Sequence, residues 1–68
     1  MREIIFLVEE SPEGGYTAKA LGLPIFTEAD DFPDLREKIK DAVNCHFDEG
    51  QEPKLIRLHV VREELMAV

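Results

Sequence analysis

Residues 2–20, REIIFLVEESPEGGYTAKA, decide the fold because they predict two strands and the turn that joins them. The first half is a dense run of β-branched and aromatic residues, which is typical of a strand. Alternation divides its apolar side chains into two sets, Ile4, Phe6 and Val8 on one face and Ile5 and Leu7 on the other. Both faces are apolar, which is the pattern of a central strand. We expect the larger set to face a helix.

The segment ESPEGG predicts a hairpin turn. Pro12 fixes one φ angle, and Gly14 and Gly15 can adopt positive φ without steric cost. A phosphate-binding loop would need glycines that lead directly into a helix N-terminus. The alternating segment YTAKA follows instead, so we interpret these glycines as turn residues. The second strand also has two sides, with Tyr16, Ala18 and Ala20 on one and Thr17 and Lys19 on the other.

Residues 25–29, IFTEA, predict a short third strand, and residues 30–50 predict a helix. Either Asp30 or Asp31 can cap this helix, Pro33 suits its first turn, and Gly50 is placed to end it. Helical spacing gives one apolar stripe, formed by Phe32, Leu35, Ile39, Ala42, Val43, His46 and Phe47.

The segment PKLIRLHVVRE, residues 53–63, predicts a fourth strand. Its two faces carry Ile56, Leu58 and Val60 on one side and Leu55, Arg57, His59 and Val61 on the other. The following ELMAV, residues 64–68, either extends this strand or forms a short return strand.

The element order is β-β-β-α-β, so we predict an α+β fold in one domain over residues 1–68. Three antiparallel strands are followed by a helix that carries the chain back, so that the fourth strand lies parallel to the first. One helix covers one face of the sheet. The apolar residues on the other face predict a homo-oligomer, either a dimer or a tetramer. The predicted interface consists of Ile5, Leu7, Thr17, Lys19, Arg57, His59 and Val61.

The 68-residue chain has a net charge of −7, which argues against unaided binding to nucleic acid or anionic lipid. With a single cysteine it can form no internal disulfide. Only five consecutive apolar residues stand near its start, too few for a signal sequence or a membrane span. We therefore expect a cytoplasmic protein that does not bind membranes.

Two groups of residues could carry chemistry. The acidic residues Glu28, Asp30, Asp31 and Asp34 suggest a metal site, but they surround a predicted helix start, which favours capping. Cys45, His46 and His59 suggest a metal or nucleophile site. Adjacent helix residues point about 100° apart, so we expect His46 to fill space in the stripe with one ring nitrogen hydrogen-bonded. We predict no catalytic, cofactor-binding or metal-binding residue and no enzyme activity.

Several short motifs resemble those of the HicB-like antitoxin family, which includes small stand-alone proteins of the UPF0150 type. The hairpin matches at Gly14, Gly15, Tyr16, Ala18 and Ala20, the following loop at Leu23 and Pro24, and the turn before the helix at Thr27 and Asp30. The resemblance covers roughly residues 1–50.

The resemblance implies a truncated ribonuclease-H-like fold without nuclease activity, because the first strand has no interior carboxylate for a two-metal site. It also implies a partner, a small basic HicA-like mRNA interferase whose active site the protein would block. The acidic chain is complementary in charge to such a toxin. The alternative is a structural or regulatory subunit with no toxin partner.

Overall fold

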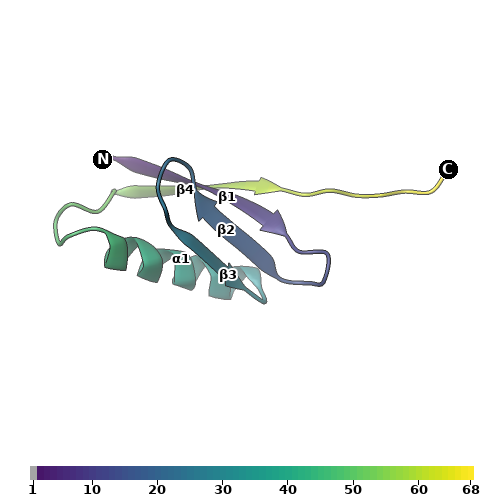
Figure 1. Cartoon of the computed structure of the whole chain (residues 1–68), viewed down its shortest axis with the longest axis horizontal. Helices are drawn as coiled ribbons and strands as arrows, with labels where there is room; N and C mark the ends of the chain where they lie inside the picture. The colour runs from purple at the N-terminus through teal and green to yellow at the C-terminus, as the bar shows by residue number, and fades with distance from the viewer. Residues whose placement is uncertain (1) are drawn as a thin grey trace.

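The computed structural model describes residues 2–68 and contains one four-stranded sheet with one helix against it (Figure 1). The elements in chain order are β1 (Glu3–Glu10), β2 (Tyr16–Ala20), β3 (Phe26–Ala29), α1 (Phe32–His46) and β4 (Leu55–Val61). The strand order is β3-β2-β1-β4, with β1 antiparallel to β2, β2 antiparallel to β3, and β1 parallel to β4. The predicted α+β fold and its connectivity are confirmed.

The β1–β2 hairpin has two glycines that serve different purposes. Gly14 and Gly15 have φ angles of +97° and +83°, a region that favours glycine. The turn is closed by Ser11, whose N–H donates to the Gly15 carbonyl and whose own carbonyl accepts from Gly14. A Cβ on Gly15 would lie 2.9 Å from the carbonyl oxygen of Ala29, whereas one on Gly14 would meet open space. Gly15 therefore also allows the close approach of the end of β3.

The core lies between α1 and one face of the sheet, and β1 runs through its centre. Ile4, Phe6 and Val8 are at most 2% exposed, so the larger apolar set of β1 faces the helix, as predicted. The other buried apolar residues are Ala18, Ala20, Ile25, Ala29, Leu35, Ile39 and Val43.

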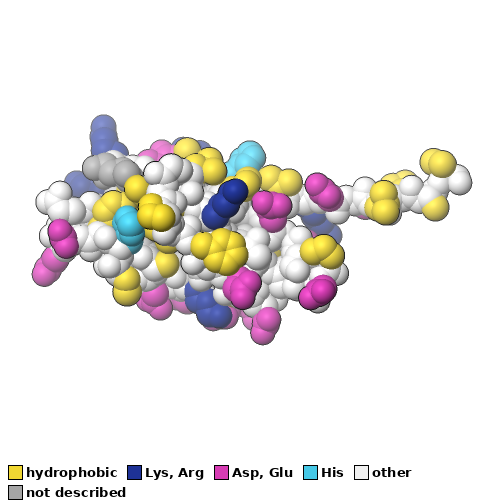
Figure 2. All heavy atoms as spheres, viewed as in Figure 1, with side chains coloured by type: hydrophobic (Ala, Val, Ile, Leu, Met, Phe, Trp, Pro, Cys, Tyr) yellow, Lys and Arg dark blue, Asp and Glu magenta, His cyan; other side chains and the backbone are white. Residues whose placement is uncertain are grey.

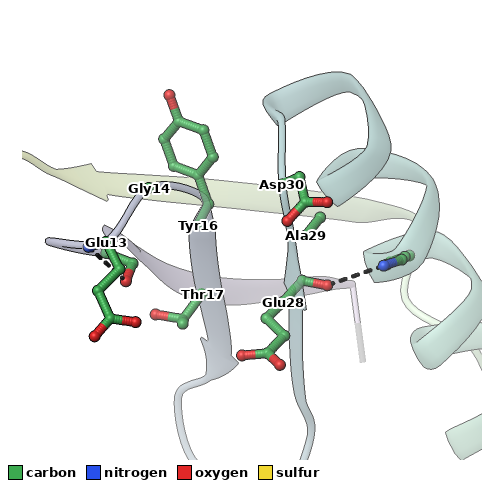
Figure 3. A pocket seen from close by; sticks show the side chains of 9 residues that line it. Glu13, Gly14, Tyr16, Thr17, Glu28, Ala29 and Asp30 are labelled. Atoms are coloured by element: carbon green, nitrogen blue, oxygen red, sulfur yellow. Dashed lines mark hydrogen bonds between the residues drawn. The ribbon is translucent and has the colours of Figure 1, made fainter.

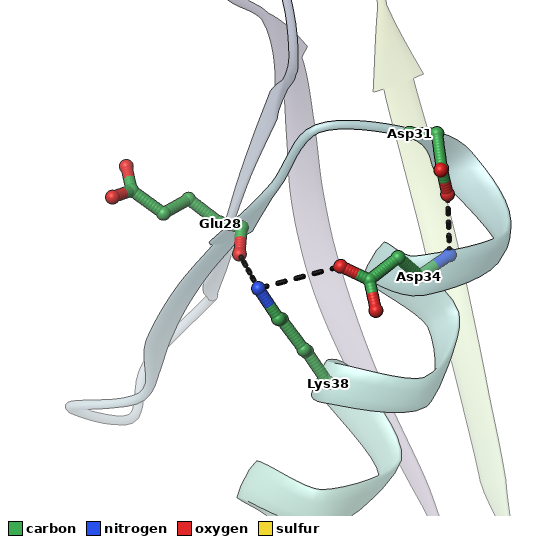
Figure 4. Close-up of polar contacts among 4 residues, drawn as sticks. All are labelled: Glu28, Asp31, Asp34 and Lys38. Carbon is green, nitrogen blue, oxygen red and sulfur yellow. Dashed lines mark hydrogen bonds and ion pairs between the residues drawn. The ribbon is translucent and has the colours of Figure 1, made fainter.

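The start of α1 is held by three polar contacts (Figure 4). The N–H of Asp34 donates to Oδ1 of Asp31 at 2.8 Å, so Asp31 and not Asp30 is the N-cap. Lys38 Nζ lies 3.4 Å from Oδ2 of Asp34 and donates to the Glu28 carbonyl at 3.3 Å. Lys38 thereby ties the first turns of α1 to β3.

The helix does not lie evenly over the sheet. It is closest to β2 and β3, whose residues beneath it include the small Ala18, Ala20 and Ala29. On the side of β4, Ile56 and Leu58 are only half-buried and Val60 is 49% exposed. The helix-facing side of β4 is therefore incompletely covered.

Two predictions about the end of the helix were wrong. α1 ends at His46, because Phe47 adopts an extended backbone (φ −101°, ψ 147°), and Gly50 belongs to a turn further on. His46 is exposed, with its ring edge-to-face against Phe47 at 5.0 Å. Phe47 is the residue that packs against the core at this point, which leaves His46 outside it.

The structure shows neither of the two options for residues 64–68, an extension of β4 or a return strand. β4 ends at Val61, and residues 62–68, here called the tail, run on without strand pairing and project from the body (Figure 1). The reason is that β1 ends at Glu10 and turns into the hairpin, so it offers the tail no neighbour. The first residue of the tail, Arg62, makes an exposed ion pair with Glu10 at 3.9 Å.

Substitution of the two hairpin glycines tests their different roles. Gly14→Ala should cost about 1–2 kcal/mol of unfolding free energy, because the positive φ is unfavourable for alanine. Gly15→Ala should cost about 1 kcal/mol or more beyond that, because its Cβ also meets a backbone carbonyl. Urea unfolding followed by circular dichroism measures both. Equal losses for the two variants would contradict the close-approach role of Gly15.

Candidate functional site

The sheet face opposite α1 is the most extended candidate surface. The strand registers place on it Glu3, Ile5, Leu7, Glu9, Thr17, Lys19, Phe26, Glu28, Leu55, Arg57, His59 and Val61, here called the uncovered face. All seven predicted interface residues therefore lie on one side of the sheet. Whether they form an interface stays a prediction.

The centre of the uncovered face alternates apolar and basic side chains. Across the strands, Phe26 pairs with Lys19, Lys19 with Leu7, and Leu7 with His59. On the next level Ile5 pairs with Arg57. Figure 2 shows hydrophobic, basic and acidic side chains close together on the face it displays. The middle of the uncovered face thus mixes apolar and basic side chains, with Glu3, Glu9 and Glu28 around them.

Besides its three glutamates, two apolar residues of this face were missed by the sequence analysis. Phe26 is 63% exposed and Leu55 is 62% exposed, against 37% for Ile5. Leu55 had been placed on the correct side of its strand, and its apolar character was the signal for including it. Phe26 carried no such signal, because only the β2–β3 register sets it beside Lys19.

One ion pair crosses the uncovered face. The guanidinium Nε of Arg57 donates to Oε1 of Glu3, which lies on the neighbouring strand. This hydrogen bond lowers the pKa of Glu3 below its usual value and raises the pKa of Arg57, with the mutual charge attraction adding to both. Because both groups are at the surface, the pair fixes local geometry more than it stabilises the fold.

A second candidate is a hollow of about 360 Å³ between the hairpin and the end of β3 (Figure 3). Its acidic groups are Glu13, Glu28 and Asp30, with Lys38 also on the lining. In Figure 3 the three carboxylates do not converge on one point. Among residues 2–68, no group of three or more His, Cys, Asp or Glu side chains could hold a metal ion. The hollow is therefore an acidic surface feature.

For Asp31 and Asp34 the sequence offered two roles, a metal site or support of the helix start. Asp31 caps α1 and Asp34 pairs with Lys38, so both support the helix start. Cys45 and His46 lie exposed near the end of α1, and His59 lies on the uncovered face of β4. The structure does not bring these three side chains together as one site. Within the described part of the chain, no helix is long and apolar enough to span a bilayer.

Comparison with known proteins adds two relatives. The chain is 60% identical over 52 residues to a UPF0150 protein of Archaeoglobus fulgidus, a match that covers 76% of this chain and 77% of that protein. It is 46% identical over 67 residues to a UPF0150 protein of Thermotoga maritima, covering 98% of this chain and 94% of that protein. No family model matches the chain. No solved structure matches it either.

Placing a charge at the centre of the uncovered face tests whether that face assembles. Leu7→Glu or the milder Ile5→Glu should lower the mass in light scattering to that of a smaller assembly, because a carboxylate would be buried at the contact. Leu7→Met conserves apolar volume and should leave the mass unchanged. Circular dichroism reports whether each variant still folds. A folded glutamate variant with the parent mass would reject this interface.

The Glu3–Arg57 pair predicts a pH effect with a definite sign. Since the folded pKa of Glu3 lies below the unfolded value, the pair contributes its stability above the unfolded pKa and loses it as the pH falls through the folded one. Arg57→Gln should return the Glu3 pKa toward its usual value. An NMR titration of the Glu3 carboxyl carbon measures this shift, and an unchanged pKa in the variant would contradict the assignment.

Proposed function

Because the chain belongs to the UPF0150 family, and because its sheet presents one uncovered apolar face, we propose that it is a non-enzymatic protein-interaction module of the HicB-like antitoxin kind. It assembles with itself through the uncovered face. In the resulting oligomer it binds a small basic HicA-like mRNA interferase and blocks that enzyme. The observation that carries the proposal is the exposure of Ile5, Phe26 and Leu55 on a face that α1 cannot reach.

Self-assembly is supported by the chemistry of the uncovered face. Burial of apolar surface is worth about 25 cal/mol per Å², a large gain for a domain whose own core contains few large side chains. The basic side chains Lys19, Arg57 and His59 are interleaved with apolar ones and do not form a separate patch. Arg57 already has its carboxylate partner in Glu3, so its burial in an interface would not leave an unpaired charge.

Toxin binding is supported by where the acidic groups lie. Glu13, Glu28 and Asp30 line the hollow between the hairpin and β3, which adjoins the uncovered face at Thr17 and Glu28. An RNA-cleaving enzyme needs cationic groups to hold the phosphate backbone. Exposed carboxylates can pair with such cationic groups in place of the RNA phosphates. The opposite charges of the two proteins also speed their association. The hollow therefore supplies an acidic surface at the border of the uncovered face.

The test begins with a search beside this gene for one that encodes a small basic interferase, whose RNA cleavage is then measured with and without the protein. The parent protein should inhibit cleavage. The double variant Glu28→Lys/Asp30→Lys should inhibit roughly tenfold less, a difference of about 1.4 kcal/mol. The matched control is Asp41→Lys, a single charge reversal on the exposed side of α1. The loss should shrink as salt rises, since screening weakens contacts between exposed charges.

Two results would count against the toxin role. Equal inhibition by the double variant and the control would show that the acidic hollow does not contact the toxin. Purification from the native host as a self-assembled oligomer alone, with no interferase gene nearby, would favour the alternative. In that case the protein is a structural or regulatory subunit without a toxin partner.

A further inference from the structure

The outer edge of β4 is an unused pairing surface. β4 is the last strand in the sheet, and the N–H of Leu55 donates to the carbonyl of Arg2 beside β1. Because successive residues of a strand point their backbone groups to opposite sides, Ile56, Leu58 and Val60 turn theirs outward. No strand in residues 2–68 pairs with this edge. Such an edge is a template for a strand of another chain.

An apolar groove lies beside this edge on the helix side. It encloses about 140 Å³ and is lined by Ile39 of α1 and by Ile56 and Leu58 of β4, with Arg36 and Lys40 at its rim. The groove exists because α1 lies closest to β2 and β3 and leaves β4 incompletely covered. Its floor is hydrophobic and its rim is basic.

The tail has the properties that this groove and edge require. Residues 62–68 are extended and unpaired, and their apolar side chains Leu65, Met66 and Val68 are among the most exposed in the molecule. Figure 2 shows hydrophobic side chains toward the end of the projecting segment. Two acidic residues, Glu63 and Glu64, precede the apolar ones. The tail is therefore acidic and then apolar, which complements a groove with a basic rim and an apolar floor.

We propose that a second copy of the chain covers this edge, with the two β4 strands paired antiparallel about a two-fold axis and the tails exchanged. The tail of each copy runs along β4 of the other, and its Met66 enters the groove formed by Ile39, Ile56 and Leu58. The contact is isologous, so each copy gives one tail and receives one. Methionine suits such a groove, because its flexible side chain adapts to irregular apolar spaces.

Alternation and charge select the register. Continued through the tail, the helix-facing set of Ile56, Leu58 and Val60 includes Met66, so Met66 lies on the correct side of the joined sheet. Pairing centred on Val61 sets Met66 opposite Ile56 and Glu63 opposite His59. Centring on Arg62 instead would set two Arg62 side chains opposite each other, which is unfavourable.

The same register explains the acidic residues. Glu64 lies on the helix-facing side, where Arg36 and Lys40 of the other copy line the groove. In the single chain, Lys40 has only an exposed contact with Glu37 at 3.7 Å, and Arg36 lies over the Phe32 ring at 5.1 Å. Both remain available at the surface to a carboxylate that arrives with the tail.

The tail cannot easily serve its own groove. Reaching it would require a tight turn directly after Val61, and the sequence REELMAV contains none of the Gly, Asn, Asp or Pro residues that such turns favour. A second copy avoids this turn, because its tail approaches the edge as a straight extension of its own β4. Edge pairing also leaves the uncovered face free on both copies, so this inference stands independently of the proposed function.

Amide hydrogen exchange measured by NMR tests the pairing. In the unpaired chain, the amides of Ile56, Leu58 and Val60 face solvent, whereas those of Arg57 and His59 face β1. If the tails are swapped between two copies, the hydrogen-exchange rates of the Ile56, Leu58 and Val60 amides should fall by a factor of at least about 100. This factor corresponds to roughly 2.7 kcal/mol of opening free energy. An oligomer formed only through the uncovered face would leave these three amides fast, so the two interfaces give different results.

Substitutions at Met66 test whether the tail is responsible for the pairing. Met66→Glu should restore fast exchange at Ile56, Leu58 and Val60 and halve the mass of the tail-exchanged assembly, whereas Met66→Leu should preserve both. Fast exchange at these amides in the parent protein at millimolar concentration overturns the proposal. So does slow exchange in a protein whose mass is that of one chain, which would show that the tail returns to its own β4.

A cysteine tests the register in the same protein. In a Cys45→Ser background, Val61→Cys places two thiols across the two-fold axis, in an antiparallel pair with Cα atoms about 4.5 Å apart, within the range that a disulfide bridges. Mild oxidation should give a covalent dimer. Asp41→Cys in the same background lies on the exposed side of α1, away from this edge and from the uncovered face, and should not crosslink. Failure of Val61→Cys to crosslink overturns the register centred on Val61.

Discussion

A four-stranded sheet has two faces, and this chain has one helix with which to cover them. Everything else in the structure depends on that shortage. The helix takes the face with Ile4, Phe6 and Val8, and these three are almost completely buried. The other face keeps Ile5 and Leu7 in a strand whose two sides are both apolar. A central strand of this composition is suited to a sheet covered on both sides, and the second cover that we propose is another copy of the chain.

Most of the fold could be predicted because its signals are local. Alternation in β1 and β4 identified which residues share a face, and the choice of the larger apolar set for the helix side was correct. The cap of α1 was narrowed to two aspartates, but only the backbone conformation at Asp31 decides between them. Helical spacing placed His46 on the apolar stripe. The apolar stripe packs against the core only as far as the helix continues. The chain leaves the helix at Phe47, which packs against the core in place of His46, so His46 is exposed.

What could not be predicted depends on strand register and on neighbours distant in sequence. Nothing in the segment IFTEA indicates that Phe26 stands beside Lys19, since that follows from the β2–β3 pairing. The separation of charge is likewise a property of the folded chain. Basic residues from β2 and β4 meet at the centre of the uncovered face, while Glu28 at its border meets acidic residues of the hairpin and the end of β3 around the hollow. A net charge of −7 describes neither surface.

The three alanines beneath α1 have a consequence in evolutionary terms. Ala18, Ala20 and Ala29 let the helix settle toward β2 and β3, and the space this leaves appears on the far side, over β4. The side-chain volume at these three positions therefore affects how accessible the groove beside β4 is. A descendant with valine or leucine there would shift its helix toward β4 and close the groove. Such a protein would be more self-sufficient as a monomer, so mutations in the core can change its associations without touching its surface.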